Sequence, residues 1–133
     1  MNELHDEYFS KGELKDGKKE GKWFGWYEGG DKRCEGEYKN GKFEGKCIWW
    51  YENGTLQHES GYKDGKRDGK CIEWYADGNK KYEGEFKDGK FEGKWNWWLT
   101  NRYEIEYKDG KIDSMVSDDT KVKEFILSNE NKK

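Results

Sequence analysis

The chain contains no proline, only two histidines and only three cysteines among its 133 residues. Without proline, long β-ladders are permitted along the whole chain. The cysteines Cys34, Cys47 and Cys71 are odd in number and lack CxxC spacing, which argues against a disulfide scaffold or a zinc site. Neither His5 nor His58 has a second ligand or a nucleophile at a catalytic spacing. We therefore expect no catalytic residue, no metal and no cofactor.

The sequence also lacks a large excess of charge of one sign and a long run of apolar residues. The chain has 26 basic and 29 acidic residues, a net charge of -3, so no basic field draws it to nucleic acid or to anionic membranes. Its first residues lack a basic region followed by an apolar stretch, and no run approaches the roughly 18 apolar residues of a membrane span. These absences predict a soluble, cytoplasmic protein without nucleic-acid or membrane partners.

Aliphatic residues are scarce, 41% of the chain is charged and the mean hydropathy is -1.47, a composition that leans towards disorder. The aromatic content, with eight Trp, nine Tyr and six Phe, opposes that reading. Each buried ring removes roughly 150 to 250 Å² from water, so rings can replace an aliphatic core. We expect one folded domain, residues 1–133.

The chain repeats itself every 24 residues. Residues 39–62 read KNGKFEGKCIWWYENGTLQHESGY and residues 63–86 read KDGKRDGKCIEWYADGNKKYEGEF. Residues 15–38 form a further copy, and a fourth, shorter copy follows, KDGKFEGKWNWWLTNRYEIEY. Three ladders keep the spacing: glycines 17, 41, 65 and 89; glycines 21, 45, 69 and 93; and Trp26, Trp50, Trp74 and Trp98.

Each repeat carries two turn signals, Asp-Gly or Asn-Gly in KDGK and a second pair at residues 29/30, 53/54 and 77/78. Such pairs favour type I′ turns, which need positive φ at both central residues. The sequence therefore predicts an all-β fold, a single-layer antiparallel meander of tandem hairpins. We divide it into an N-terminal cap strand (1–14), four repeats (15–107) and a last strand (108–116). Helical spacing over 117–129 predicts a short C-terminal capping helix.

Two-residue loops fix the register of the strands. Around Asn40 and Gly41, the numbers of paired residues should sum to 81, which places Gly36 opposite Gly45. The same rule pairs glycine or serine with glycine at the other KDGK turns. It also predicts three Glu–Lys rungs, Glu35–Lys46, Glu59–Lys70 and Glu83–Lys94.

The pleat then separates two faces. One holds rings lying over glycines, and the other holds the charged rungs and a tryptophan stripe, in which Trp26, Trp50 and Trp74 pair with Arg33, Gln57 and Lys81. Trp and Arg are typical of protein-interface hot spots, and Trp can also stack on sugars. Alternatively, the stripe packs against a folded-over sheet or the terminal helix. The candidate partner-binding residues are Trp26, Arg33, Trp50, Trp74, Lys81 and Trp98.

Other chemical patterns favour structural roles. This register places His58 opposite Cys71, a geometry that could activate a thiol, and makes Cys34 and Cys47 a cross-strand pair close enough for a disulfide. It also sets Glu37 against Glu44 and Glu85 against Glu92, which their repetition identifies as a solvated charged edge. The KDGK loops lack the acidic run of a calcium loop and a following GKS or GKT.

The segments CEGEYKNGKFEG (34–45) and YEGEFKDGKFEG (82–93) resemble the MORN (membrane occupation and recognition nexus) repeat. The pattern KDGK-x-x-GKW-x-x-WY-x-NG is similar to a bacterial variant found in antitoxin proteins of the YwqK type, over roughly residues 9–111. The resemblance implies a curled sheet of hairpins that serves as an interaction scaffold, with an antitoxin or immunity role.

We therefore expect a non-catalytic scaffold that neutralises a bacterial toxin by direct binding. The alternatives are a glycan- or cell-wall-binding module, suggested by the Gly, Trp and Tyr content, and a lipid-surface scaffold, suggested by the family name.

Overall fold

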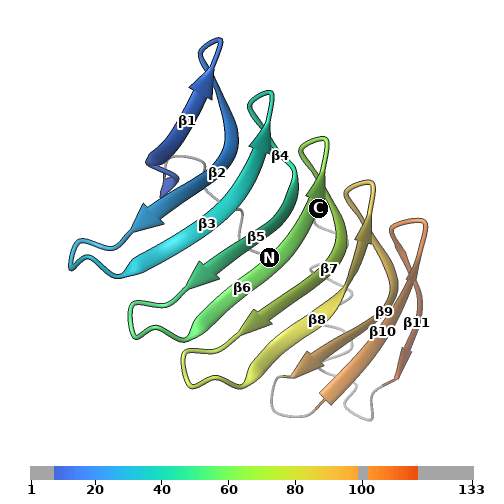
Figure 1. Ribbon diagram of the computed structural model, residues 1–133. Helices are drawn as coiled ribbons and strands as arrows, with labels where there is room; N and C mark the ends of the chain where they lie inside the picture. The colour runs from blue at the N-terminus through green and yellow to red at the C-terminus, as the bar shows by residue number, and fades with distance from the viewer. Residues whose placement is uncertain (1–7, 99–101, 117–133) are drawn as a thin grey trace.

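The computed structural model describes residues 8–98 and 102–116, which form one open antiparallel sheet (Figure 1). Its strands are β1 (Lys11–Lys15), β2 (Lys18–Trp26), β3 (Lys32–Lys39), β4 (Lys42–Phe43), β5 (Gly45–Trp50), β6 (Leu56–Lys63), β7 (Lys66–Trp74), β8 (Lys80–Lys87), β9 (Lys90–Trp98), β10 (Arg102–Lys108) and β11 (Lys111–Val116). The strands pair in chain order, with β4 and β5 both pairing with β3.

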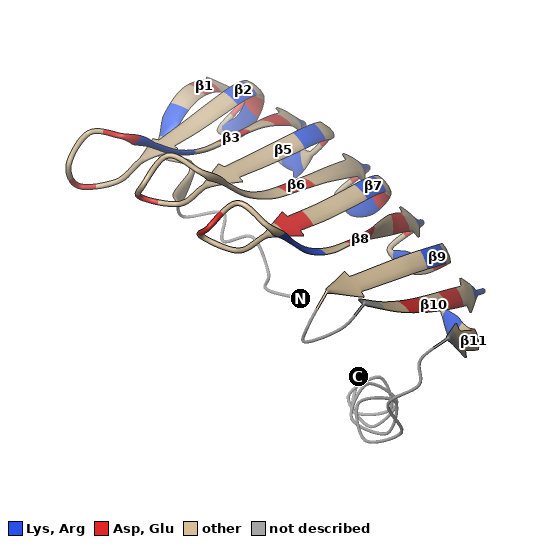
Figure 2. Ribbon diagram, turned by 90° about the horizontal axis from the view of Figure 1, so that it is seen from below, with Lys and Arg blue, Asp and Glu red and all other residues tan. Residues whose placement is uncertain are grey.

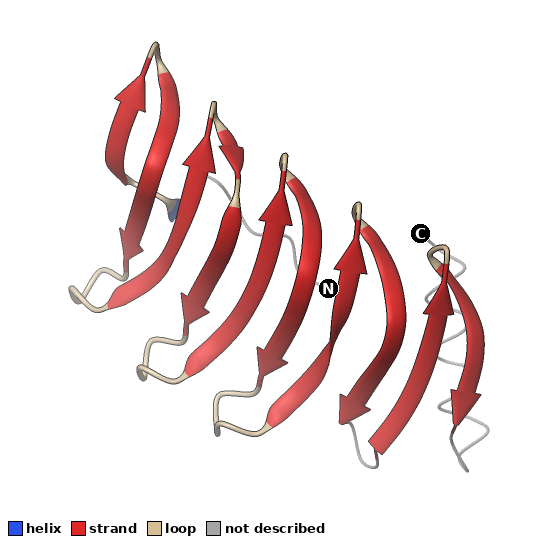
Figure 3. Cartoon of the chain, turned by 45° about the vertical axis from the view of Figure 1, so that its right-hand side comes forward, coloured by secondary structure: helices blue, strands red, loops and turns tan. Residues whose placement is uncertain are grey.

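The predicted single-layer meander is confirmed. Figure 3 shows strand following strand in one layer, with no helix among the described strands and turns except a single short turn at Tyr8. The expected capping helix (117–129) lies outside the described residues. The N-terminal strand begins at Lys11, and residues 8–10 precede it without strand structure.

The KDGK turns have the predicted type I′ conformation. Asn40 and Gly41 have φ values of 52° and 81°, and the Asp-Gly pairs at 16/17, 64/65, 88/89 and 109/110 also have positive φ at both positions. An asparagine or aspartate tolerates the left-handed conformation at the first position, and glycine adopts it at the second without steric cost. These five turns stand along one edge of the sheet.

The turns at the other edge differ from the prediction. At residues 29/30, 53/54 and 77/78 only the second residue, Gly30, Gly54 or Gly78, has positive φ. The Gly30 amide donates to the Tyr27 carbonyl at 2.9 Å, and the Tyr27 amide donates to the Asp31 carbonyl at 2.8 Å. This is a three-residue loop in which a β-turn is followed by a left-handed glycine, so the expectation of type I′ turns here was wrong.

The predicted register holds beside the KDGK turns and is wrong beyond them. Lys39 pairs with Lys42 as expected, but Glu35 pairs with Ile48 instead of Lys46. Two extra residues in the second strand, around the positive-φ Gly45, shift the partners by two. The same shift follows the turns at 16/17, 64/65 and 88/89, so glycines 12 and 84 and Ser60 lie opposite Trp23, Trp95 and Cys71, and the predicted Glu–Lys rungs are not formed. Because the shift is even, each side chain keeps its face.

The buried side chains lie on one face, which we call the core face, and they form two clusters. The first contains Phe9, Trp23, Cys34, Tyr38, Cys47 and Trp49. The second contains Cys71, Tyr82, Phe86, Phe91, Trp95, Ile105 and Tyr107. Trp95 is fully buried, and its ring centroid lies 4.9 Å from that of Phe91 and 5.0 Å from that of Phe86. Aromatic rings thus supply the core that aliphatic residues do not.

Hydrogen bonds between successive repeats fix their spacing at both edges. The hydroxyls of Tyr27, Tyr51 and Tyr75 donate to the backbone carbonyls of Trp50, Trp74 and Trp98, at 2.6, 2.6 and 3.0 Å. At the KDGK edge, the Asn40 amide donates to the Glu20 carboxylate at 2.7 Å, and the Gly41 amide donates to the Lys19 carbonyl at 2.9 Å. These hydrogen bonds therefore fix the position of each repeat relative to the next.

Candidate functional site

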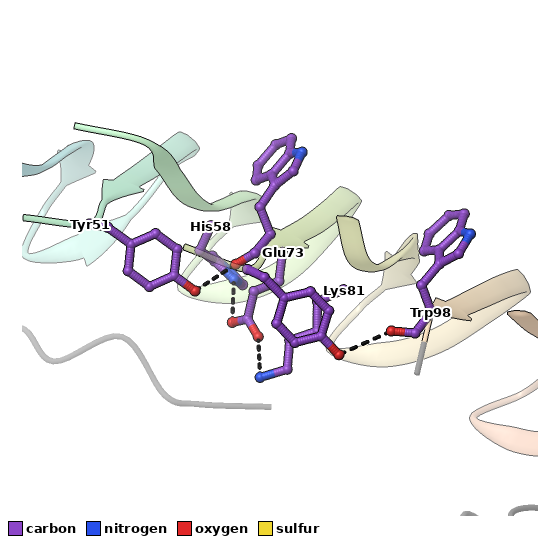
Figure 4. Close-up of polar contacts among 7 residues, drawn as sticks. Tyr51, His58, Glu73, Lys81 and Trp98 are labelled. Carbon is purple, nitrogen blue, oxygen red and sulfur yellow. Dashed lines mark hydrogen bonds and ion pairs between the residues drawn. The ribbon is translucent and has the colours of Figure 1, made fainter. Parts of the chain in front are cut away.

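Four tryptophans, Trp26, Trp50, Trp74 and Trp98, lie in one row on the face opposite the core face. We call this face the outer face and the four residues the tryptophan row. Each is the last residue of its strand, so the row follows one edge of the sheet. In Figure 4, Trp98 points away from the side on which Tyr51 and Glu73 lie. Because the tyrosine hydroxyls bind the carbonyls of three of these residues, the row has a regular spacing.

The predicted partners of the row were displaced by one residue. Trp26 pairs with Lys32, and Trp74 pairs with Lys80. In β3 and β8 one extra residue, Arg33 or Lys81, stands between this pair and the next pair of the ladder. This bulge turns the side chains of Arg33 and Lys81 to the core face. The Arg33 guanidinium lies 3.5 Å from the Tyr8 ring centroid there. The structure thus leaves the four predicted tryptophans together and separates Arg33 and Lys81 from them.

The tryptophan row is partly exposed and is flanked by lysines. Trp26 is 41% exposed, and the other three are half-buried. The Lys32 ammonium lies 5.8 Å from the Trp50 ring centroid, and the Lys80 ammonium lies 5.9 Å from that of Trp98. Among the described residues no second layer covers the row, so its predicted packing against a folded-over sheet is not found there.

Charged residues of both signs occur along the strands (Figure 2). Lys80 forms an ion pair with Glu83 at 2.8 Å, and the Lys46 ammonium lies 2.7 Å from the Glu59 carboxylate. The described part of the outer face therefore combines aromatic surface with charges of both signs.

The outer face is hollowed where the strands bulge near Gly21. This open hollow has a volume of about 750 Å³, with Phe24 and Trp26 among its lining residues and with Lys11 and Lys22 at its sides. Two smaller hollows, of about 180 and 410 Å³, lie at later repeats and contain no aromatic residue. Of these three hollows, the one with the largest volume thus lies at the first member of the tryptophan row.

The core face carries a buried polar group in its middle, which sequence reasoning missed (Figure 4). His58 and Glu73 are 3% and 6% exposed, and their Nδ1 and Oε1 atoms lie 3.4 Å apart. Lys81 Nζ lies 3.3 Å from the other Glu73 oxygen. Burial acts to raise the pKa of Glu73, but the hydrogen bond with His58 and the charge of Lys81 outweigh it and hold this pKa below its usual value.

The three cysteines are buried. Burial raises the pKa of Cys34 and of Cys47 to about 12 and that of Cys71 to about 11. Cys34 pairs with Trp49, so the predicted Cys34–Cys47 rung was wrong, and all three thiols are free. His58 pairs with Glu73, and the predicted His58–Cys71 pair was also wrong. The shifted register is the cause in both cases.

The facing carboxylates are placed as predicted. Glu85 pairs with Glu92, and the Glu44 amide donates to the Glu37 carbonyl at 2.8 Å. Glu85 and Glu37 are exposed, in keeping with a charged edge. Within residues 8–98 and 102–116 no group of three His, Cys, Asp or Glu side chains is placed to hold a metal ion. The same part of the chain has no helix long and apolar enough to cross a bilayer.

These features define a class, the tandem β-hairpin repeat scaffold, with a regular sheet and a repeated surface row. A MORN repeat model matches residues 11–22, 34–56, 58–80 and 82–94, more than half of the chain, and a model of a MORN repeat variant matches residues 19–40. The chain belongs to the MORN repeat family, whose members are generally non-catalytic binding scaffolds. No curated protein sequence matches it.

Proposed function

We propose that this chain is a non-catalytic scaffold that binds a partner protein through the tryptophan row, and that the partner is a bacterial toxin that it neutralises. The observation that carries the proposal is the row itself, four tryptophans at a constant spacing on the face opposite the core. The toxin assignment depends on the similarity of the repeat to the bacterial antitoxin variant.

The surroundings of the row fit a protein interface. Tryptophan contributes strongly to binding hot spots, and charged residues at the rim add specificity more than affinity. Trp26 and Leu56 are exposed apolar side chains on the outer face, and Lys32 and Lys80 border the row. The hollow beside Phe24 and Trp26 can take an apolar side chain of the partner.

Rigidity favours the same function. Hydrogen bonds from tyrosine hydroxyls hold the carbonyls of Trp50, Trp74 and Trp98. Because the row is held before the partner arrives, little conformational entropy is lost on binding. A lipid surface fits less well, since basic side chains on the described part of the outer face form ion pairs, such as Lys46–Glu59.

The test compares wild type with Trp26→Ala/Trp74→Ala, using Leu14→Ala as the matched control because Leu14 is 63% exposed and lies outside the row. Each immobilised protein is incubated with extract of its native cell, and retained proteins are quantified by mass spectrometry. We expect one protein retained by wild type and by Leu14→Ala but lost from the double variant. Identical retention by all three would refute the site, and a glycan-array signal without protein retention would favour the glycan module.

The toxin assignment has its own test. The retained protein is expressed alone and with each variant, and growth is followed. We expect growth arrest that wild type relieves and the double variant does not. A retained protein without toxicity would remove the antitoxin role and leave the scaffold role.

A further inference from the structure

The KDGK turns after the first rest on the repeat that precedes them. The glycine of the turn donates its amide to a carbonyl of that repeat at 2.8 to 3.0 Å, in the pairs Gly41–Lys19, Gly65–Phe43 and Gly89–Arg67. The glycine also lies against the aliphatic stem of a lysine, in the pairs Gly41–Lys18, Gly65–Lys42, Gly89–Lys66 and Gly110–Lys90. A Cβ added to these four glycines would lie 3.3 to 3.9 Å from the lysine Cβ. The same contact thus joins each repeat to the next.

The first turn, at Asp16 and Gly17 between β1 and β2, has the same conformation without this contact. Gly17 has a φ of 77°, yet a Cβ added to it would meet no atom of the described residues within 4 Å. β1 is the first strand of the sheet, and all five of its residues are exposed (Figure 1). The first repeat therefore presents to solvent the edge with which each later repeat contacts its neighbour.

Leu14 belongs to the same edge. The equivalent position of the later repeats, two residues before the turn, holds an aromatic ring on the core face: Tyr38, Tyr62, Phe86 or Tyr107. The Tyr62 ring centroid lies 4.9 Å from that of Phe43 in the preceding repeat, and the Tyr107 centroid lies 4.6 Å from that of Phe91. Leu14 is 63% exposed, whereas Tyr107 is 2% exposed. An apolar side chain at a core position is thus left in solvent, because no repeat precedes it in the described sheet.

The opposite end of the sheet, at β11, carries the other half of the contact. Lys111 directly follows the last turn and is exposed, just as Lys18 directly follows the first turn. Ile112 comes next, in the position that Phe43 and Phe91 hold in earlier repeats, and it packs half-buried against the second aromatic cluster. In the described part of the sheet no strand follows β11. The lysine stem and the apolar side chain that receive a following repeat are therefore both present at this end.

We propose that copies of this chain associate head to tail, with β1 of one copy antiparallel beside β11 of another, as β10 lies beside β9 within the chain. The Gly17 turn then rests on the Lys111 stem and donates its amide to the Ile112 carbonyl, and Leu14 packs against the Ile112 side chain. Exposed strand edges favour such pairing between chains. A second copy fits the edge because the contact requires a turn glycine and an apolar side chain three residues before it, which is the spacing of this repeat.

The association is heterologous, because it joins different edges of two copies, and it can therefore continue beyond two copies. A single strand edge is small compared with a standard interface, so we expect a dissociation constant between about 1 μM and about 1 mM. The contacts lie at the two ends of the sheet, and the tryptophan row on the outer face stays accessible. The association is thus independent of the proposed binding of a partner protein.

Cysteine cross-linking tests whether these two edges meet. Gly17→Cys and Lys111→Cys are made in separate full-length chains, which are mixed with oxidised glutathione at the upper end of this concentration range. Within the chain, a Cβ on the equivalent Gly41 lies 3.5 Å from Lys18 Cβ, a separation that suits a disulfide. We expect the mixture to form disulfide-linked pairs of copies. The matched control is Gly54→Cys mixed with Lys111→Cys, because Gly54 is also a turn glycine with positive φ and open space around it.

The chemistry has its own control, the single chain Lys18→Cys/Gly41→Cys, which should form an internal disulfide. The proposal is overturned if this control forms its disulfide while the Gly17→Cys mixture links no more than the Gly54→Cys mixture. Gly17→Cys chains that link to one another as readily as to Lys111→Cys would also overturn it, since the contact would then join two identical edges.

Sedimentation of the purified chain measures the association without a cross-link. We expect the average mass of wild type to rise with concentration past that of two copies. Leu14→Glu should weaken the association at least about tenfold, because it places a charge in the apolar contact. Leu56→Glu is the matched control, since Leu56 is 37% exposed and begins β6, far from both ends of the sheet, and it should leave the association unchanged. A mass of one copy throughout the range, a limit at two copies, or equal effects of the two variants would contradict the proposal.

Discussion

Gly84 lies directly beneath the indole of Trp95, and replacing it by alanine tests how the core is built. A Cβ at Gly84 would lie 2.1 Å from Trp95 Cδ2 and 2.3 Å from Cε2. The ring has little freedom to move, because it is fully buried among Phe86 and Phe91 and its Nε1 donates to the Glu85 carbonyl at 3.0 Å. Overpacking costs about 1 to 3 kcal/mol and loss of the indole hydrogen bond about 1 kcal/mol. We expect Gly84→Ala to lose about 2 to 4 kcal/mol of unfolding free energy.

Urea denaturation followed by fluorescence measures this change. The matched control is Gly36→Ala, whose Cβ would lie 3.2 Å from Cys47 Sγ and 3.3 Å from the Phe9 ring. Because the equivalent residue two strands along, Ser60, already carries a Cβ opposite Cys71, we expect this control to cost about 1 kcal/mol or less.

A double-variant cycle isolates the clash. In a Trp95→Cys background, the Gly84→Ser change rebuilds the Ser60–Cys71 rung, and its cost should fall below about 1 kcal/mol. Equal losses for Gly84→Ala and Gly36→Ala, or a Gly84→Ala chain as stable as wild type, would refute the view that these glycines make room for rings.

Three further predictions concern the remaining contacts. Tyr51→Phe removes the 2.6 Å hydrogen bond to the Trp74 carbonyl and should cost about 1 kcal/mol in urea denaturation, whereas no change would make the bond irrelevant to stability. Folding lowers the pKa of Glu73, so the ionised carboxylate stabilises the fold at pH values above its unfolded pKa, and this stabilisation is lost as the pH falls through the folded pKa. The difference in unfolding free energy between wild type and Glu73→Gln should therefore shrink from about pH 6 to about pH 3. A difference that stays constant over this range would contradict the prediction. Burial and raised pKa values should keep all three thiols unreactive towards a disulfide reagent at pH 8 until urea is added, and rapid reaction of the folded chain would count against the core packing.

The fold could be predicted because the 24-residue period, the Asn-Gly and Asp-Gly pairs and the absence of proline all indicate the same meander. Pairing beside each KDGK turn followed from loop length, as at Lys39–Lys42. The pairing further from each turn could not be predicted in this way, because the second glycine of the repeat, such as Gly45, lies in a bulge and does not face another glycine. Positive φ was expected at the turn glycine, such as Gly41, but nothing in the sequence indicated that Gly45, four residues later, adopts it as well.

The tryptophan row could be predicted from its spacing, and its neighbours could not. Because each turn is followed by one extra residue in the next strand, Lys32 and Lys80 lie beside the row where Arg33 and Lys81 were predicted. The type of turn decides whether that extra residue is present. The polar group at Glu73 was hidden for another reason. The equivalent residues of the two adjacent repeats are Trp49 and Trp97, and a carboxylate at a position that both neighbouring repeats fill with tryptophan was the available signal.

The most direct test of the tryptophan row is the dissociation constant of the retained partner, measured by calorimetry for wild type, Trp26→Ala/Trp74→Ala and Leu14→Ala. If the row is the binding surface, each tryptophan removed should cost about 2 kcal/mol or more, so the double variant should bind several hundred-fold more weakly or not at all. Leu14→Ala should match wild type. Equal affinity of all three folded proteins would contradict the account.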